Sequence, residues 1–182
     1  MAHVTTLAEA FEATLKDIYY AENAILKALP KIIDKAGAPA LKQALESHRQ
    51  ETQGQVQHLE HVFQSIGVKP SGEKCKAIEG ILAEGEEHMG HATQPALDAI
   101  IVASSQAVEH YEITRYGTLI AWADELGYRQ ASQMLQQVLQ QEKSADQKLT
   151  ALAEAQINDR AQGGAQGGRQ MAAQGGQGGQ TY

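Results

Sequence analysis

The sequence has few aromatic residues, one cysteine and no long apolar run, and each shortage excludes a class of protein. Aromatic residues make up 5% of the 182 residues, which disfavours a β-sandwich, whereas Ala, Leu, Gln and Glu are abundant and favour helices. The single cysteine, Cys75, cannot form an internal disulfide, and the N-terminal residues lack a secretory pattern, so we expect a cytoplasmic protein. No apolar stretch approaches the roughly 18 residues of a membrane-spanning helix, so we expect no membrane association.

Positive charge is also scarce. There are 15 Lys and Arg residues against 22 Asp and Glu, and the net charge of −7 gives no electrostatic reason to expect nucleic acid as a partner. Residues 161–182 consist mainly of Gly, Gln and Ala, with almost no large apolar side chain to bury. The sequence therefore predicts a folded domain over residues 1–160 and a flexible Gly/Gln-rich tail over residues 161–182.

Four long segments show the spacing of apolar residues that is typical of amphipathic helices. They run approximately over Thr5–Lys35, Pro39–Ile66, Thr93–Gly127 and Arg129–Ile157, and a shorter helix is predicted over Glu73–His88. Thr5 and Thr93 are the expected N-caps, and Pro30 is expected to kink the first helix. Two tight loops give two antiparallel hairpins, and one long connection crosses the bundle. The prediction is an all-α fold, a ferritin-like four-helix bundle.

Carboxylates interrupt the apolar stripe of every long helix near its middle. An uncompensated carboxylate in a core is costly, and the stripes contain no Lys or Arg to compensate it. Metal ions held by inward oxygen ligands are the economical explanation, so we expect two ions, Fe or Mn in the first place and Mg or Ca as alternatives. The predicted ligands, in chain order, are Glu22, Glu51, Gln55, Glu109, Glu112, Glu142 and Asp146.

The two predicted hairpins repeat the same arrangement of acids. Glu22 and Glu112 occupy corresponding positions, and Glu51 and Glu142 follow them at nearly equal intervals. This pattern predicts a pseudosymmetric pair of metal positions, with Glu51 and Glu142 as bridges and Glu22 and Glu112 as terminal ligands. Glu109 has no acidic counterpart in the first hairpin, so we expect the site to be asymmetric.

Four stretches around these acids carry a specific pattern. They are Tyr20-Ala21-Glu22, HRQETQGQV at 48–56, VEHYEITRY at 108–116 and EKSADQKL at 142–149. In these stretches the chain resembles the YciE/YciF-like bacterial stress proteins of the ferritin-like superfamily, over most of residues 5–155. The resemblance implies a bundle that forms a homodimer, a carboxylate-rich metal site and a stress-response role whose chemistry is undefined for the family.

One departure from the wider superfamily concerns histidine. Ferritin-like oxidases carry Glu-x-x-His, but Gly54 and Ala145 stand three residues after the second glutamate of each hairpin, so iron is less strongly indicated. His48 and His110 are near enough to supply nitrogen or to support a ligand, and the alternative is an ordinary hydrogen-bonded histidine. Four tyrosines are predicted close to the carboxylates, where they take part in redox chemistry, hydrogen-bond to the metal ligands or, as the favoured alternative, pack in the core with a bonded hydroxyl: Tyr19, Tyr20, Tyr111 and Tyr116.

Two functions of different classes fit these features. The first is a di-metal redox protein that consumes a small oxidant, peroxide or oxygen, at a site inside the bundle. The second is a non-catalytic, metal-stabilised binding or scaffold protein, in which the metal neutralises the buried acids without turnover. A storage cage is less favoured, because the sequence identifies no cage contacts.

Overall fold

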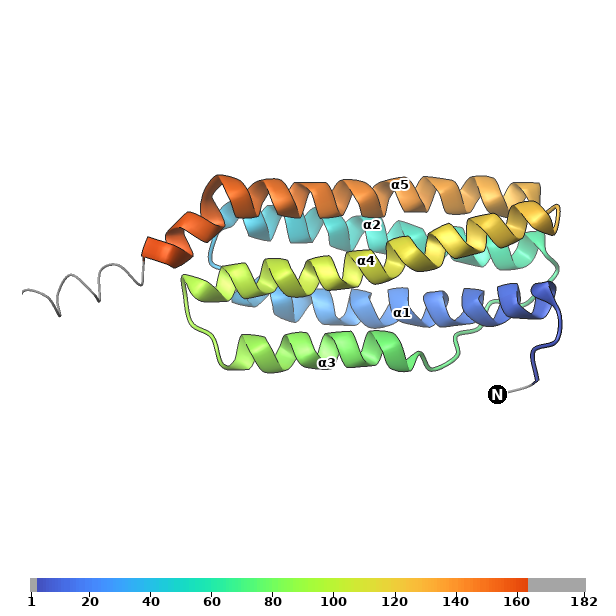
Figure 1. Ribbon diagram of the computed structural model, residues 1–182, viewed down its shortest axis with the longest axis horizontal. Helices are drawn as coiled ribbons and strands as arrows, with labels where there is room; N and C mark the ends of the chain where they lie inside the picture. The colour runs from blue at the N-terminus through green and yellow to red at the C-terminus, as the bar shows by residue number, and fades with distance from the viewer. Residues whose placement is uncertain (1–2, 164–182) are drawn as a thin grey trace, which may run out of the picture.

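The computed structural model describes residues 3–163, which are almost entirely helical (Figure 1). The helices are α1 (Leu7–Lys35), α2 (Pro39–Ser65), α3 (Lys76–Gly90), α4 (Ala96–Glu125) and α5 (Arg129–Leu152), followed by a π-helical segment, η1 (Ala153–Ile157). Residues 3–163 contain no β-strand, so the all-α prediction is confirmed. Helix continues to residue 163, past the predicted boundary at 160, and the rest of the predicted tail lies outside the described residues.

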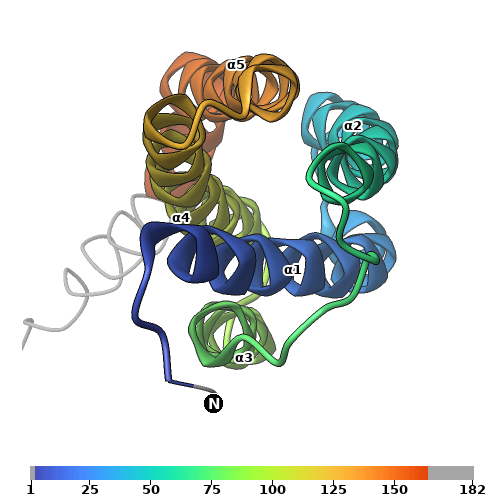
Figure 2. The ribbon, with the colours of Figure 1, turned by 90° about the vertical axis from the view of Figure 1, so that its right-hand side faces the viewer.

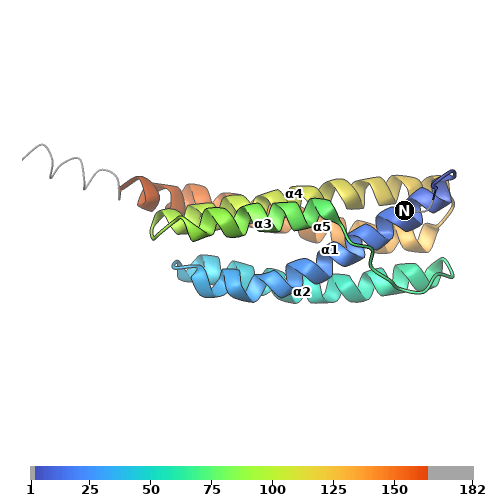
Figure 3. The same cartoon turned by 90° about the horizontal axis from the view of Figure 1, so that it is seen from below.

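The four long helices surround a common core, and α3 lies outside them against α1 and α4 (Figure 2). α1 and α2 form one antiparallel hairpin and α4 and α5 form the other (Figure 1). The connection from α2 carries α3 back along the bundle before α4 begins (Figure 3). This is the predicted ferritin-like connectivity, two hairpins joined by a crossover with a short extra helix. Among residues 3–163, no helix is long and apolar enough to cross a membrane.

Helix ends follow from local chemistry, and two predicted caps were wrong. α1 is capped by Thr6 rather than Thr5: the Thr6 hydroxyl accepts from the Glu9 amide at 3.2 Å, and the Glu9 carboxylate accepts from the Thr6 amide at 2.9 Å. α4 begins at Ala96 with Pro95 as its N-cap, so the side chain of Thr93 caps nothing. α1 continues through Pro30, and α3 begins and ends later than the predicted Glu73–His88.

A buried acid fastens the α1–α2 turn to the start of α4. The Asp98 side chain accepts from the backbone amides of Gly37 at 2.7 Å and Ala38 at 2.9 Å, and from the Gln94 amide at 2.8 Å. Asp98 is 7% exposed, and its oxygens replace the water that these turn amides would otherwise need. This contact sets how the two hairpins meet at one end of the bundle.

Apolar layers enclose the middle of the core. On α1, Ile18 and Ile25 lie one turn to either side of Glu22, and all three side chains are at most 2% exposed. At the far end, Phe11 packs edge-on against Tyr128 with ring centroids 5.6 Å apart. The acid of α1 is therefore buried between apolar layers, as the stripe predicted.

Candidate metal centre

A cluster of acids and one histidine occupies the middle of the bundle. His48 from α2, Glu109 and Glu112 from α4 and Glu142 from α5 each place one ligand atom so that all four atoms lie within 4.8 Å of one another. Glu22 from α1 completes the group, since its charge raises the pKa of Glu112 and the charge of Glu142 raises the pKa of Glu22. The four glutamates are at most 1% exposed and His48 is 7% exposed. These buried residues could hold a metal ion.

Most polar atoms of this cluster find no hydrogen-bond partner among the described residues. They are both carboxylate oxygens of Glu112 and of Glu142, Oε2 of Glu22 and of Glu109, and Nδ1 of His48. Buried polar atoms are almost always paired, and leaving a charged one unpaired is strongly unfavourable. A cation bound among His48, Glu109, Glu112 and Glu142 would give unpaired atoms of this cluster a partner, and hard oxygen donors with one imidazole suit Mn, Fe, Mg or Zn. The residues present therefore fit a metal ion.

Burial dominates the electrostatics of the acids. Loss of water raises the pKa of Glu109 to about 8, and the charges of Glu22, Asp146 and Glu51 add to the effect. Burial, followed by the charges of neighbouring acids, also raises the pKa of three further glutamates well above the usual 4.5: Glu22, Glu112 and Glu142. Without a cation, burial therefore favours the protonated form of these acids.

His48 is held in its neutral form. Burial lowers the pKa of His48 to about 4, and the positive charge of Lys148 acts in the same direction. His48 Nε2 lies 3.3 Å from Glu109 Oε1, and because the ring is neutral this close contact is not an ion pair near neutral pH. A neutral imidazole keeps the lone pair that a metal ion requires.

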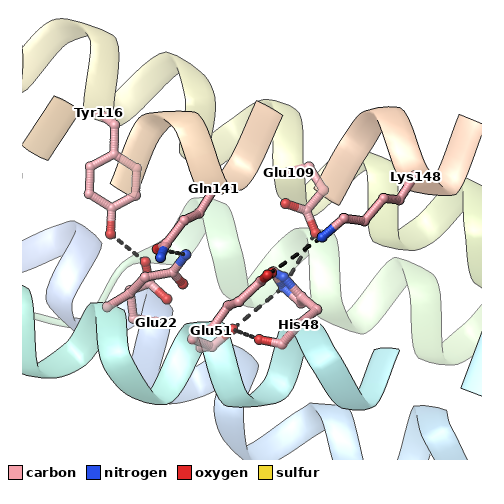
Figure 4. Close-up of polar contacts among 9 residues, drawn as sticks. Glu22, His48, Glu51, Glu109, Tyr116, Gln141 and Lys148 are labelled. Carbon is pink, nitrogen blue, oxygen red and sulfur yellow. Dashed lines mark hydrogen bonds and ion pairs between the residues drawn. The ribbon is translucent and has the colours of Figure 1, made fainter. Parts of the chain in front are cut away.

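Other polar side chains lie beside Glu22 and His48 (Figure 4). The fully buried Tyr116 hydroxyl donates to Oε1 of Glu22. Gln55, 1% exposed, donates its amide to Gln141 at 3.2 Å while its own oxygen has no partner within the described part of the chain. The hydroxyl of the buried Thr52 donates to the His48 carbonyl at 2.9 Å.

The other predicted site residues lie at the edge of the cluster or away from it. Glu51 is 29% exposed, and its carboxylate is 3.5 Å from Lys148 Nζ. Asp146 is 20% exposed, and its carboxylate lies 3.3 Å from His110 Nε2, a ring that is itself 68% exposed. The Tyr20 hydroxyl donates to Glu79 at 2.6 Å, outside the cluster. The structure therefore brings Glu22, Gln55, Glu109, Glu112, Glu142 and His48 into the core and leaves four predicted residues outside it.

The prediction that Glu51 interrupts the buried stripe of α2 was wrong. Thr52, not Glu51, is the buried residue between His48 and Gln55. Successive residues of a helix point about 100° apart, so Glu51 is rotated toward the α2–α5 edge. Glu51 still lines a small cavity of about 10 Å³ together with His48 and Glu109. Its role as a bridging ligand stays a prediction.

Comparison with known proteins now adds the family. Residues 6–162 match a family described as a domain of unknown function, DUF892. The chain belongs to this family. It is similar to protein YciF of Escherichia coli (strain K12), with 37% identity over 162 residues, which cover 88% of this chain and 98% of YciF. The YciF-like resemblance seen in the sequence is thereby confirmed.

Solved structures of similar chains share the helical bundle. The E. coli stress protein YciF has a TM-score of 0.81 at 38% identity, covering 85% of this chain and 99% of that one. YcfI from Rhodopseudomonas palustris, named as a candidate structural protein, has a TM-score of 0.80 at 49% identity. The match covers 82% of this chain and 96% of YcfI. A protein from Xanthomonas campestris pv. campestris, at 23% identity and a TM-score of 0.70, shows the same fold over 86% and 99% of the two chains.

Proposed function

We propose that this DUF892 protein binds two divalent metal ions inside its bundle, Fe or Mn, and uses them to consume peroxide or oxygen during stress. The observation that carries the proposal is the set of buried carboxylate oxygens without partners in the cluster. Two divalent ions bring four positive charges, which balance the four buried glutamates of the cluster: Glu22, Glu109, Glu112 and Glu142. Glu51 and Asp146, at the edge, are proposed as further ligands that turn inward.

The chemistry balances with two metal ions. Reduction of one hydrogen peroxide to two waters takes two electrons and two protons, and two ferrous or manganous ions supply one electron each. The chain's own residues hold the ions together, exclude bulk water from between the apolar layers, and release protons when the ions bind. Tyr116 keeps the Glu22 carboxylate in position through its hydroxyl.

Rapid mixing tests the redox proposal. Protein loaded anaerobically with Fe(II) or Mn(II) is mixed with hydrogen peroxide or with oxygen, and metal oxidation is followed by absorbance. We expect the parent to oxidise its metal faster than the double variant Glu112→Gln plus Glu142→Gln, which keeps the shape of the site and removes two charges. Glu87→Gln, at an exposed position of α3, is the matched control. Equal rates for the parent and the double variant would contradict the proposal.

A non-catalytic scaffold is the second candidate. It is favoured by Gly54 and Ala145, which stand where ferritin-like oxidases carry histidine, and by the description of the Rhodopseudomonas palustris relative. In that case chelation lowers the melting temperature, because a ligand that binds only the folded state stabilises it, and no oxidant is consumed with any metal. Sustained oxidant consumption would exclude it.

We also propose that the protein is a cytoplasmic homodimer. The support is the YciF-like resemblance and the buried free thiol of Cys75, which needs no oxidising compartment. Native mass spectrometry tests the oligomer: a dimer mass is expected, and a large cage or a stable monomer would overturn it. Fractionation of the source cells tests the location.

A further inference from the structure

Two adjoining hollows lead from the surface to one side of the metal cluster. The inner hollow is a cavity of about 30 Å³ bounded by α1, α3 and α4, and its wall includes His48 and Glu109. The outer hollow is an open groove of about 380 Å³ between α1 and α3. Four residues belong to both walls and form a waist between them: Ala28, Ile32, Leu82 and Met89. The two hollows therefore adjoin along these four side chains, and together they are called the passage below.

The passage becomes apolar before it reaches the cluster. Lysines and glutamates border the outer groove, but the waist carries no charged or hydrogen-bonding side chain. Beyond the waist, the polar side chains are those of Ser104, Ser105, His48 and Glu109. An ion that crossed the waist would lose its water without gaining a partner, which is strongly unfavourable. The passage therefore selects against ions and favours uncharged molecules.

The inner cavity also limits size. A cavity needs roughly 10–15 Å³ to hold one water molecule, so the inner cavity of about 30 Å³ suits a molecule of about two heavy atoms. Gly85 on α3 keeps the space narrow, because it lets α3 approach α4 so closely that an added Cβ would lie 3.1 Å from the Cβ of Ser104. The crossover helix therefore forms a close-fitting outer wall beside the cluster.

We infer that this passage is the entry and binding site of the oxidant, an uncharged molecule of two heavy atoms, dioxygen or hydrogen peroxide. It brings the oxidant to the edge of the cluster formed by His48 and Glu109. The inference rests on the proposed redox function and adds the route and the substrate class. The charged edge at Glu51 and Lys148 lies on the other side of these two residues, between α2 and α5, away from the apolar waist.

Xenon tests the passage without metal or turnover, since it binds in apolar cavities. Crystals of the metal-free protein are pressurised with xenon and compared with those of two variants. Ala28→Phe adds a ring at the waist, and Ala10→Phe makes the same change at another half-buried position of α1, outside both hollows. We expect a xenon site between α1, α3 and α4 in the parent and in Ala10→Phe, and its loss in Ala28→Phe. An empty cavity in the parent would overturn the inference.

Kinetics with each oxidant distinguish dioxygen from peroxide. In single-turnover mixing of Fe(II)- or Mn(II)-loaded protein, we expect Ala28→Phe to raise the half-saturating concentration of the oxidant that uses the passage about ten-fold, because overpacking must be relieved at each entry. The limiting rate and the metal content should stay unchanged. Ala10→Phe should match the parent. An active parent whose half-saturating oxidant concentrations are unaffected by Ala28→Phe would overturn the passage and leave the redox function standing. A parent that oxidises no metal would overturn the redox function and the inference together.

Discussion

Removing the metal should make the protein's stability fall as the pH rises from 6.5 to 8.5. The cause is the buried acids, whose pKa values in the folded state lie above those of the unfolded chain. A raised folded pKa means that the native state binds more protons than the unfolded state in this window, so the free energy of unfolding decreases as the pH rises. His48 acts in the opposite direction, but mainly between its folded pKa of about 4 and its usual 6.5.

Glu109 alone sets the scale of the effect. Its pKa rises from the usual 4.5 to about 8 on folding. Integrated from pH 6.5 to pH 8.5, this shift lowers the free energy of unfolding by about 2 kcal/mol. For a chain of this size, that loss corresponds to a melting temperature lower by about 4–8 °C. Glu22, Glu112 and Glu142 act in the same direction, so the total decrease is larger.

Urea denaturation of chelator-treated protein at the two pH values measures the effect. Glu109→Gln should flatten the pH dependence by about 2 kcal/mol, because it removes one titrating group and lessens the repulsion on its neighbours. Glu87→Gln, an exposed change of the same chemistry on α3, should leave the profile of the parent unchanged. If metal-free parent and Glu109→Gln give the same pH profile, Glu109 does not titrate as a buried acid and the electrostatic argument is wrong.

Three further predictions concern residues around the cluster. Tyr116→Phe removes the hydroxyl that donates to Glu22, so metal affinity should fall about 10–100-fold in a chelator-competition titration. Unchanged affinity would show that the hydroxyl does not support the site. Asp98→Ala leaves two turn amides unpaired and should lower the free energy of unfolding, measured in urea, by about 2–4 kcal/mol. A loss well below about 1 kcal/mol would show that Asp98 does not fasten the α1–α2 turn to α4. Glu51→Gln should reduce metal affinity in the same titration less than Glu142→Gln does, because Glu51 must turn inward from the exposed edge to reach an ion, whereas Glu142 is already buried in the cluster. The reverse order would contradict this ranking of the two ligands.

The sequence predicted the layered core of α1 because apolar spacing and a single interrupting acid point the same way. Ile18, Glu22 and Ile25 share one helix face, and no other acid lies close to Glu22 in the sequence of this helix. On α2 the pattern was less decisive. Glu51 and Thr52 are adjacent at the edge of the stripe, and the small neutral Thr52 gives no pattern that marks it as buried. Tertiary packing against α5 decides between them, and spacing along one helix contains no information about that packing.

Long-range contacts explain what the sequence did not predict. Asp98 meets the turn at Gly37 and Ala38 only after the two hairpins have packed together, so no local pattern indicates the clamp. Tyr116 was one of several tyrosines near the acids, and only the packed bundle distinguishes it from Tyr20, which bonds Glu79 instead. The passage beside the cluster likewise depends on how closely α3 packs against α1 and α4, and the sequence predicted only that a short helix exists there.

Anomalous diffraction from crystals grown with Mn(II) or Fe(II) tests the metal centre most directly. Data collected on both sides of the metal's absorption edge locate the ions independently of any assumed ligand. We predict two peaks roughly 3.5–4 Å apart in the core, within coordinating distance of the buried glutamates and His48. Metal-loaded crystals with no anomalous peak among these side chains, or with peaks only at exposed histidines such as His88 and His91, would contradict the account.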